Sequence, residues 1–283
     1  MCTSSGELER CGCPACGTQR PPRSRYTHGP FSVVRCGSCR LWYLSPRLSQ
    51  DAIQAHYEAA GYFEGGDAGY SSYAHQERSL RLTFRRLLRR MKRRGWTGGT
   101  LLEIGCGYGY FLEEARGFFE RRTGTEMAPE ACERARRRAD DIYPGGIDQV
   151  PATERFHCIV ALQVIEHIYD PLDFVRALAS RLEVGGTLVL STPDMGSFWR
   201  ALMGGRWASF KYPEHVAFYD SRTLPALMRE AGLAELQRVP HPHAFPAGEV
   251  LAKLGFASAR RWLPGSLWVP ATTLAFAGRR TGR

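Results

Sequence analysis

Two cysteine pairs are the first residues whose type and spacing could do chemistry. Cys13-Pro-Ala-Cys16 and Cys36-Gly-Ser-Cys39 each place two thiols on a short turn, and 19 residues separate the pairs. Four thiolates spaced in this way fit the tetrahedral coordination that zinc adopts in structural sites. We therefore predict a structural zinc site, because four protein ligands leave no open position for catalysis. Cys11 is an alternative ligand that spacing alone does not exclude.

Three glycines form a second candidate site. The run LLEIGCGYGYF places Gly105, Gly107 and Gly109 directly after a predicted strand and before a predicted helix. Glycines at such a turn let the backbone approach a ligand closely at the carboxyl edge of a sheet. A dinucleotide fingerprint would need a glycine at the position of Tyr110. The spacing therefore favours a ligand without a pyrophosphate, such as the methionine part of S-adenosylmethionine (SAM).

An acid follows the next predicted strand. Glu126 lies 21 residues after Gly105, where a carboxylate can accept hydrogen bonds from both hydroxyls of a ribose. The glycine turn alone is a weak signal, whereas the turn together with this acid is much stronger. We therefore predict that Glu126 binds the ribose of the cofactor.

The glycine loop and Glu126 can contact one ligand only if both lie at the carboxyl edge of the same sheet. From Thr100 onward, short apolar runs alternate with helical patterns, which is typical of a parallel sheet with crossover helices. We predict strands over residues 100–104, 122–126, 158–162, 187–191, 234–239 and 273–277. We predict helices over residues 52–60, 80–91, 171–182 and 224–231, with Ser221 as the cap of the last one.

Several stretches together resemble the class I SAM-dependent methyltransferases. They are LLEIGCGYG, the acid Glu126, ALQVIEHIYDP and VGGTLVLSTP, and the similarity covers roughly residues 99–240. The chain is most similar to a ubiquinone-methyltransferase-like branch, in which an N-terminal zinc ribbon can precede a segment like Cys39-Arg40-Leu41-Trp42-Tyr43. The resemblance implies an α/β, Rossmann-like fold: a seven-stranded, mostly parallel sheet with helices on both faces and an antiparallel last strand.

The resemblance also implies which residues hold SAM. The methionine part is surrounded by the glycine loop and the acid before it: Glu103, Gly105, Cys106, Gly107 and Gly109. Glu126 and Met127 contact the ribose and the adenine. Asp148 contacts the adenine amino group, and Gln163 lies beside the methyl group.

Three zones follow from composition and from the resemblance. We expect residues 1–50 to form the zinc ribbon, residues 51–98 a helical connector, and residues 99–283 the SAM-binding methyltransferase domain. Within that domain, residues 192–219 are rich in Trp, Phe, Gly and Tyr. An irregular aromatic insert of this length is usually a lid or a binding segment.

One motif of the related enzymes is incomplete here. Some ubiquinone-type O-methyltransferases bind a metal through Glu-x-x-Glu-His, whereas this chain reads Gln163-Val-Ile-Glu166-His167. An amide is a poor replacement for a charged ligand of a hard cation. The sequence therefore argues against metal-dependent methylation.

Methyl transfer to a neutral hydroxyl benefits from a base, for which histidine is suited. His167 and His215 both fall in segments expected at the carboxyl edge of the sheet. His215 lies in Tyr212-Pro213-Glu214-His215, within the aromatic insert, and related methyltransferases carry a similar Pro-Glu-His run. We predict His215 as the base, with Glu214 orienting its ring and His167 as the alternative.

Composition limits the class of protein. Hydrophobic residues make up 43% and charged residues 23% of the 283 residues, and no apolar run is long enough to span a membrane. The start MCTSSGELER lacks the order of a secretory signal. We therefore expect a cytoplasmic protein without a membrane partner, whose cysteines are metal ligands or buried thiols and do not form a disulfide framework.

The net charge of +10 is concentrated in one segment. Residues 77–94 carry nine basic residues and one acid, which accounts for +8. Arginine makes up 35 of the 38 basic residues, an excess that often reflects nucleotide composition. The segment is therefore only a weak indication of nucleic-acid binding, and a solvated helix face is the preferred interpretation.

Three functions fit these observations. The first is a SAM-dependent methyltransferase of a small molecule, acting on oxygen of a natural-product, sugar or phenolic acceptor. The second is an RNA methyltransferase that binds RNA through the zinc ribbon and the basic helix. The third is a non-catalytic binding module on the same scaffold. The intact glycines and Glu126 favour the first two, and the aromatic insert favours the first. The sequence does not identify the acceptor or the oligomeric state.

Overall fold

The computed structural model describes residues 3–5, 7–19, 23–59, 75–253 and 265–282. Contacts divide the chain into two units. The first contains Met1–Ala60, Ala161–Val239 and Leu274–Arg283, and the second contains Gly61–Val160 and Pro240–Thr273.

A seven-stranded sheet forms the largest element, with the order β13-β16-β11-β10-β7-β8-β9. In that order the strands are β13 (Leu233–Arg238), β16 (Thr273–Arg280), β11 (Leu182–Pro193), β10 (Phe156–Leu162), β7 (Thr100–Ile104), β8 (Arg121–Glu126) and β9 (Asp141–Pro144). β7 pairs parallel with β8 and β8 parallel with β9, whereas β13 and β16 are antiparallel. The last strand thus lies between β11 and β13. This order confirms the predicted α/β, Rossmann-like methyltransferase fold.

The six predicted strands all exist. The bounds are as predicted only over 100–104, and the largest difference is in β11, which begins five residues before the predicted 187. The helix predicted over 171–182 ends at Ser180 as α5 (Pro171–Ser180), and Leu182 already begins β11. The predicted end of the helix was wrong because Leu182 is fully buried. An apolar residue at this position fits the helical period of α5 and also the first position of β11. The short strand β9 was not predicted, since Asp141–Pro144 carries no alternating pattern.

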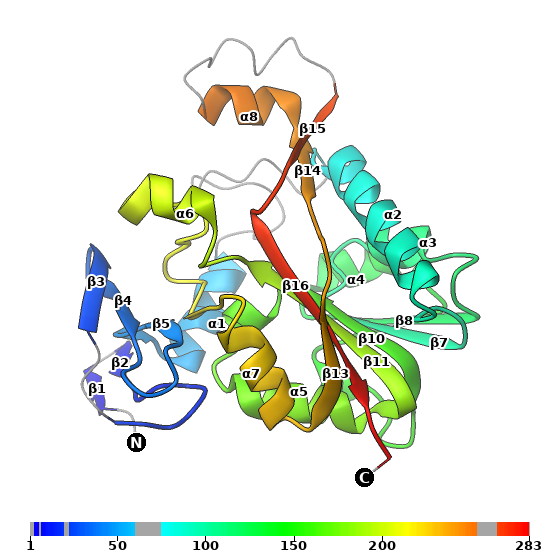
Figure 1. Cartoon of the computed structure of the whole chain (residues 1–283), viewed down its shortest axis with the longest axis horizontal. Helices are drawn as coiled ribbons and strands as arrows, with labels where there is room; N and C mark the ends of the chain where they lie inside the picture. The colour runs from blue at the N-terminus through cyan, green and yellow to red at the C-terminus, as the bar shows by residue number, and fades with distance from the viewer. Residues whose placement is uncertain (1–2, 6, 20–22, 60–74, 254–264, 283) are drawn as a thin grey trace. The chain divides into compact units, whose positions relative to one another are not determined.

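Small sheets make up much of the N-terminal segment. β1 (Thr3–Ser5), β2 (Leu8–Arg10) and β6 (Arg47–Leu48) form one of them. A four-stranded sheet has the order β12-β5-β4-β3, with β12 (Ala217–Phe218), β5 (Trp42–Leu44), β4 (Phe31–Arg35) and β3 (Arg23–His28). β3, β4 and β5 follow one another at the blue end of the chain in Figure 1. β12 comes from the insert predicted as a lid, so this insert completes the sheet of the N-terminal segment.

The helices of the first unit are short. They are α1 (Gln50–Ala59), α5, α6 (Phe198–Met203) and α7 (Thr223–Glu230), with the 3-10 turns η2 (Ile165–His167) and η3 (Gly204–Arg206). The cap predicted at Ser221 is wrong. The Asp220 carboxylate accepts the backbone N–H groups of Arg222 and Thr223 at 2.9 and 2.8 Å, because an Asp side chain reaches the free N–H groups of a first helical turn.

The second unit contains α2 (Glu77–Arg93), α3 (Tyr110–Glu114), α4 (Pro129–Ala135), the 3-10 turn η1 (Ile147–Gln149), α8 (Ala247–Lys253) and a hairpin of β14 (His243–Pro246) and β15 (Ser266–Val269). α2 packs beside α3 and β14 (Figure 1). It buries the predicted apolar face of Leu80, Phe84, Leu87, Leu88 and Met91. Its cations therefore mostly face solvent. Within the described part of the chain, no helix combines the length and hydropathy needed to cross a bilayer.

Candidate functional site

The four predicted zinc ligands come together in the first unit. The sulfur atoms of Cys13, Cys16, Cys36 and Cys39 all lie within 4.8 Å of one another. The Sγ–Sγ distances are 3.4 Å between Cys13 and Cys39 and 3.7 Å between Cys16 and Cys36. Sulfurs bound tetrahedrally to one zinc are about 3.8 Å apart, given Zn–S bonds of about 2.3 Å. The donor set therefore fits a four-thiolate zinc site.

The backbone around these sulfurs has the form of two tight turns. Gly17 has a positive φ of 68°, and the Ser38 N–H points at the Cys36 sulfur at 3.3 Å. Such an N–H stabilises a thiolate. Cys11 lies outside the cluster and is disulfide-bonded. The alternative with Cys11 as a ligand is thus wrong in this structure, and the expectation of unpaired cysteines fails at this residue.

In the second unit, the glycine loop follows β7 as predicted. Gly105, Gly107 and Gly109 have φ values of 67°, 53° and 77°, which side chains other than glycine's rarely adopt. A Cβ at Gly109 would also meet the backbone of Ala135 at 3.1 Å. Both effects require glycine here, and the absence of side chains lets the backbone approach a ligand closely.

Glu126 ends β8, and its carboxylate joins the two loops of the predicted cofactor site. One oxygen accepts the Gly107 N–H at 2.8 Å, and the other accepts the N–H groups of Met127 and Ala128 at 2.8 and 3.0 Å. Burial raises the pKa of Glu126, and these N–H groups lower it. Because an ionised carboxylate offers about four lone-pair positions, three N–H contacts leave capacity for a ribose hydroxyl.

A second carboxylate is buried close to the first. Glu103 in β7 is 3% exposed, and its Oε2 has no hydrogen-bond partner in the described ranges. Burial and the nearby Glu126 raise the pKa of Glu103 well above its usual value. An unsatisfied buried acid is costly unless a ligand pairs with it. The ammonium group of a methionine moiety is a suitable partner, in agreement with the predicted role of Glu103.

The other predicted cofactor residues differ in exposure. Cys106 is buried, Met127 is 76% exposed and Asp148 is exposed in η1. Gln163 belongs to the first unit, follows β10 and has a positive φ of 61°, while its side-chain amide donates to the Ser191 hydroxyl at 3.3 Å. A left-handed conformation in a residue other than glycine is a strained feature that occurs frequently at functional sites.

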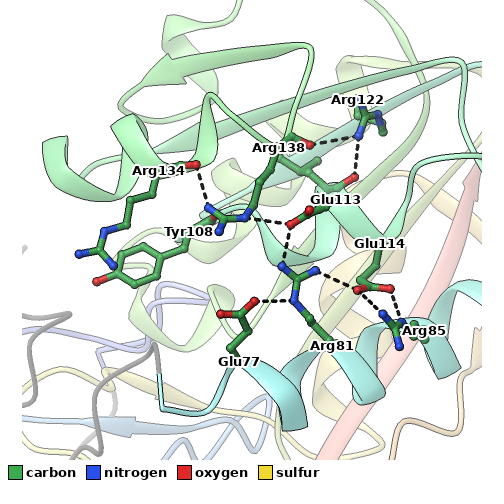
Figure 2. Close-up of polar contacts among 10 residues, drawn as sticks. Glu77, Arg81, Arg85, Tyr108, Glu113, Glu114, Arg122, Arg134 and Arg138 are labelled. Carbon is green, nitrogen blue, oxygen red and sulfur yellow. Dashed lines mark hydrogen bonds and ion pairs between the residues drawn. The ribbon is translucent and has the colours of Figure 1, made fainter.

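An ion-pair network supports the glycine loop (Figure 2). Arg81 of α2 donates to Glu77 at 2.8 Å and to Glu113 of α3 at 2.6 Å. Arg138, just after α4, donates to Glu113 at 2.9 Å and to the carbonyl oxygen of Tyr108 at 3.2 Å. The network therefore joins three helices and holds the loop through the Tyr108 carbonyl.

A cavity of about 480 Å³ adjoins this network. Its lining residues are polar or aromatic: Glu77, Tyr108, Tyr110, Glu113, Arg134, Arg137 and Arg138. Glu113 pairs with Arg138, whereas Glu77 pairs with Arg81 and Arg134 with Glu130, two partners that lie outside the lining. The guanidinium groups of Arg81 and Arg138 lie 4.9 and 5.2 Å from the centre of the Tyr110 ring. We assign the cavity a supporting role and not a catalytic one.

The structure brings together the two predicted candidate bases in the first unit. The rings of His167 and His215 are 4.7 Å apart and nearly perpendicular. Nδ1 of His215 lies 2.9 Å from the carbonyl oxygen of Ser209. Because a carbonyl only accepts, Nδ1 carries the proton and Nε2 is left as the basic nitrogen. The Ser209 carbonyl thus holds the ring nitrogen that we had expected Glu214 to hold.

Burial controls the charge of this cluster. It lowers the pKa of His167 to about 4 and the pKa of His215 well below its usual value, so both rings are neutral near pH 7. It also raises the pKa of Glu166 to about 8. Donor atoms of these three residues lie within 4.8 Å of one another, close enough to hold a cation. The sequence argument against metal-dependent methylation rests on Gln163 and is still a prediction.

Comparison with known proteins shows to which family the chain belongs. A sequence model described as a methyltransferase domain matches residues 73–238, which is more than half of the chain. The chain belongs to the class I SAM-dependent methyltransferase family. Its glycine loop, Glu126 and the pair of histidines all lie within the matched residues.

Relatives and solved structures agree with this assignment. The chain is 33% identical over 141 residues to a ubiquinone biosynthesis O-methyltransferase of Methylobacterium sp. (strain 4-46), covering 42% of this chain and 57% of that protein. A SAM-dependent methyltransferase of Thermotoga maritima superposes with a TM-score of 0.54 at 19% identity, covering 74% of this chain and 94% of the other. Magnesium protoporphyrin IX methyltransferase of Synechocystis PCC 6803 was solved with bound S-adenosylhomocysteine (SAH). It superposes with a TM-score of 0.54 at 11% identity, covering 82% of this chain and 100% of the other. These structures show the shared fold.

Sequence reasoning missed two parts of this methyltransferase site. The first is Ser209, whose carbonyl fixes the His215 tautomer; a backbone acceptor leaves no signal in the residue type. The second is the network around Arg81 and Arg138. Its signal was present in the high density of arginines on α2 and in the acids of α3, but pairing between separate helices is not visible in a linear pattern.

Proposed function

We propose that this chain transfers a methyl group from SAM to an oxygen atom of a small natural-product, sugar or phenolic molecule. One observation carries the proposal: two histidines from separate segments meet in a buried cluster and stay neutral near pH 7. A neutral imidazole is the form that can take a proton from a hydroxyl. The curated relatives are named as O-methyltransferases, which supports oxygen as the acceptor atom.

The residues of the second unit would hold the cofactor. Glu126 would accept from the ribose hydroxyls, Glu103 would face the ammonium group, and the glycine loop would allow close approach of the methionine part. SAM supplies a methyl group that is already activated, so the protein mainly orients the acceptor and excludes water. Four thiolates would hold a structural zinc ion in the first unit.

His215 would act through Nε2, because its Nδ1 donates to the Ser209 carbonyl. His167 is the alternative base; it is partly exposed, whereas His215 is buried. His215 therefore reaches an acceptor only if the acceptor enters the buried cluster, whereas His167 is nearer to solvent. Glu214, which is 8% exposed, belongs to the same segment and would shape the acceptor site.

Substitution of each histidine tests the proposal once an acceptor is found. The acceptor would come from a screen of hydroxylated small molecules for release of S-adenosylhomocysteine (SAH). His215→Ala and His215→Gln should keep SAH affinity and lower turnover at least about 100-fold at pH 7, the range in which a general base contributes. A loss below about tenfold in a folded variant removes His215 from this role, and the same measurement on His167→Ala then decides whether His167 is the base.

A further inference from the structure

The sheet of the N-terminal segment is completed by the segment that carries His215. β12 pairs antiparallel with β5, with Ala217 opposite Tyr43 and Phe218 opposite Trp42. β12 begins two residues after His215. A β-strand that belongs to a sheet has its backbone fixed by the partner strand, so β5 sets where the chain leaves His215.

A chain of backbone hydrogen bonds continues from β5 to the second histidine. The N–H of Leu44 donates to the Val216 carbonyl at 2.9 Å, and the N–H of Val216 donates to the Glu166 carbonyl at 2.8 Å. Val216 directly follows His215, and Glu166 directly precedes His167. The neighbours of both histidines, Val216 and Glu166, are therefore linked to Leu44 of β5 through backbone hydrogen bonds.

Aromatic packing ties the same segments together. Phe218 and Phe210 of the insert share a buried cluster with Trp42 and Val33 of the N-terminal sheet. The Tyr212 ring, three residues before His215, stacks on His28 with centroids 5.2 Å apart. The insert therefore packs on the N-terminal sheet both before and after His215.

The four cysteines lie at the start of this connection. Cys36 directly follows β4 and begins the turn to Cys39, and its N–H donates to the Leu41 carbonyl at 2.8 Å. Cys39 lies three residues before β5. A short segment that supplies four thiolates to one metal gains folding free energy from binding that metal. Occupancy of the four-sulfur site should therefore control how firmly β5 is held.

We infer that the zinc ribbon is a positioning element of the acceptor site: metal at Cys13, Cys16, Cys36 and Cys39 fixes β5, and β5 fixes the strand that places His215. Trp42, Tyr43 and Leu44, which form β5, are positioning residues in this account. The role of His215 itself rests on the proposed function, whereas the coupling between metal and β12 does not.

Hydrogen exchange of the full chain tests the coupling without an acceptor. Zinc is removed with a chelator, and its release is followed with a metal-sensitive dye. Amides of 214–219 should then exchange at least about tenfold faster, while those of β7 and β8 keep their protection. Reloading with Co²⁺ should restore protection together with a thiolate charge-transfer absorption band. Unchanged exchange of 214–219 in the metal-free protein overturns the inference, whatever the enzyme methylates.

A reciprocal measurement covers the case in which removal of zinc unfolds the whole chain. Two coupled sites influence each other equally, so loosening β12 must weaken the hold on the metal. Phe218→Ala removes a 2% exposed ring of β12 and should lower the zinc affinity, measured by equilibrium competition with a chelator, at least about tenfold. Val184→Ala, at a 72% exposed position of β11, should bind zinc with wild-type affinity. Wild-type zinc affinity in a folded Phe218→Ala variant contradicts the inference.

Once an acceptor is known, turnover gives a third readout. Phe218→Ala should lower kcat through misplacement of His215, while SAH affinity stays within about twofold, because β12 and the glycine loop are separate elements. A variant that loses SAH affinity and kcat in the same proportion would show a general loss of structure and contradict a positioning role.

Discussion

Glu126→Gln is the substitution whose effect the structure predicts most closely. The carboxylate accepts three backbone N–H groups, one from Gly107 and two from Met127 and Ala128, at 2.8, 2.8 and 3.0 Å. A glutamine has the same shape but only one accepting oxygen, and its NH₂ group would face at least one N–H donor. The variant therefore loses charge and also places donor against donor in a buried site.

The size of the effect follows from the bonds involved. Hydrogen bonds to a charged group contribute about 1.5–3 kcal/mol each, and a buried donor left unpaired costs about 1–3 kcal/mol. Part of this loss acts on the folded chain, and part acts on the ribose contact. We expect SAH to bind about 1–3 kcal/mol more weakly, which is roughly 5- to 150-fold in Kd. Glu126→Ala should change affinity in the same direction.

Isothermal calorimetry with SAH measures this change, and circular dichroism shows whether the variant is folded. Glu130→Gln is the matched control, because Glu130 lies on α4 and its half-exposed carboxylate pairs with Arg134 at the surface. That variant should bind SAH within about twofold of wild type, since surface ion pairs contribute little. Wild-type affinity in a folded Glu126→Gln variant would refute the role of this carboxylate.

Three further predictions concern metal, pH and the supporting network. Cys36→Ser combined with Cys39→Ser should abolish zinc binding in elemental analysis, and full occupancy in that variant would exclude the four-thiolate site. Burial lowers the pKa of His241 to about 3, so the folded state resists protonation and its stability is lost as pH falls from about 6.5 toward 3. Urea unfolding should show wild type losing about 1.4 kcal/mol per pH unit relative to His241→Asn in this range, and parallel curves would contradict it. Arg138→Ala should lower SAH affinity and unfolding free energy by about 1 kcal/mol each, whereas unchanged calorimetry would remove Arg138 from support of the loop.

The local features of this fold were predictable from sequence because local chemistry decides them. The glycine loop needs positive φ at Gly105, Gly107 and Gly109, and no other residue type meets that need at low cost. The apolar runs Cys158–Leu162 of β10 and Leu188–Leu190 of β11 are typical of strands whose two faces are both covered. The four cysteines carried their own spacing signal.

Long-range contacts were not predictable in the same way. His167 and His215 meet although they are 48 positions apart, and the sequence pattern predicted only that each lies near one edge of the sheet. The pairing of β12 with β5 involves a two-residue strand, which is too short to show any period. For that reason the aromatic insert was predicted as a lid alone, whereas in the structure it also supports the N-terminal sheet.

Transfer of a labelled methyl group tests the central claim most directly. The full chain is incubated with SAM that carries a trideuteromethyl group and with a panel of hydroxylated small molecules, with bulk RNA as a separate acceptor. The account predicts that mass spectrometry finds the label on an oxygen atom of a small molecule, and that His215→Ala abolishes nearly all of this product. Label recovered only in RNA, or no transfer to any acceptor by a chain that binds SAH, would contradict it.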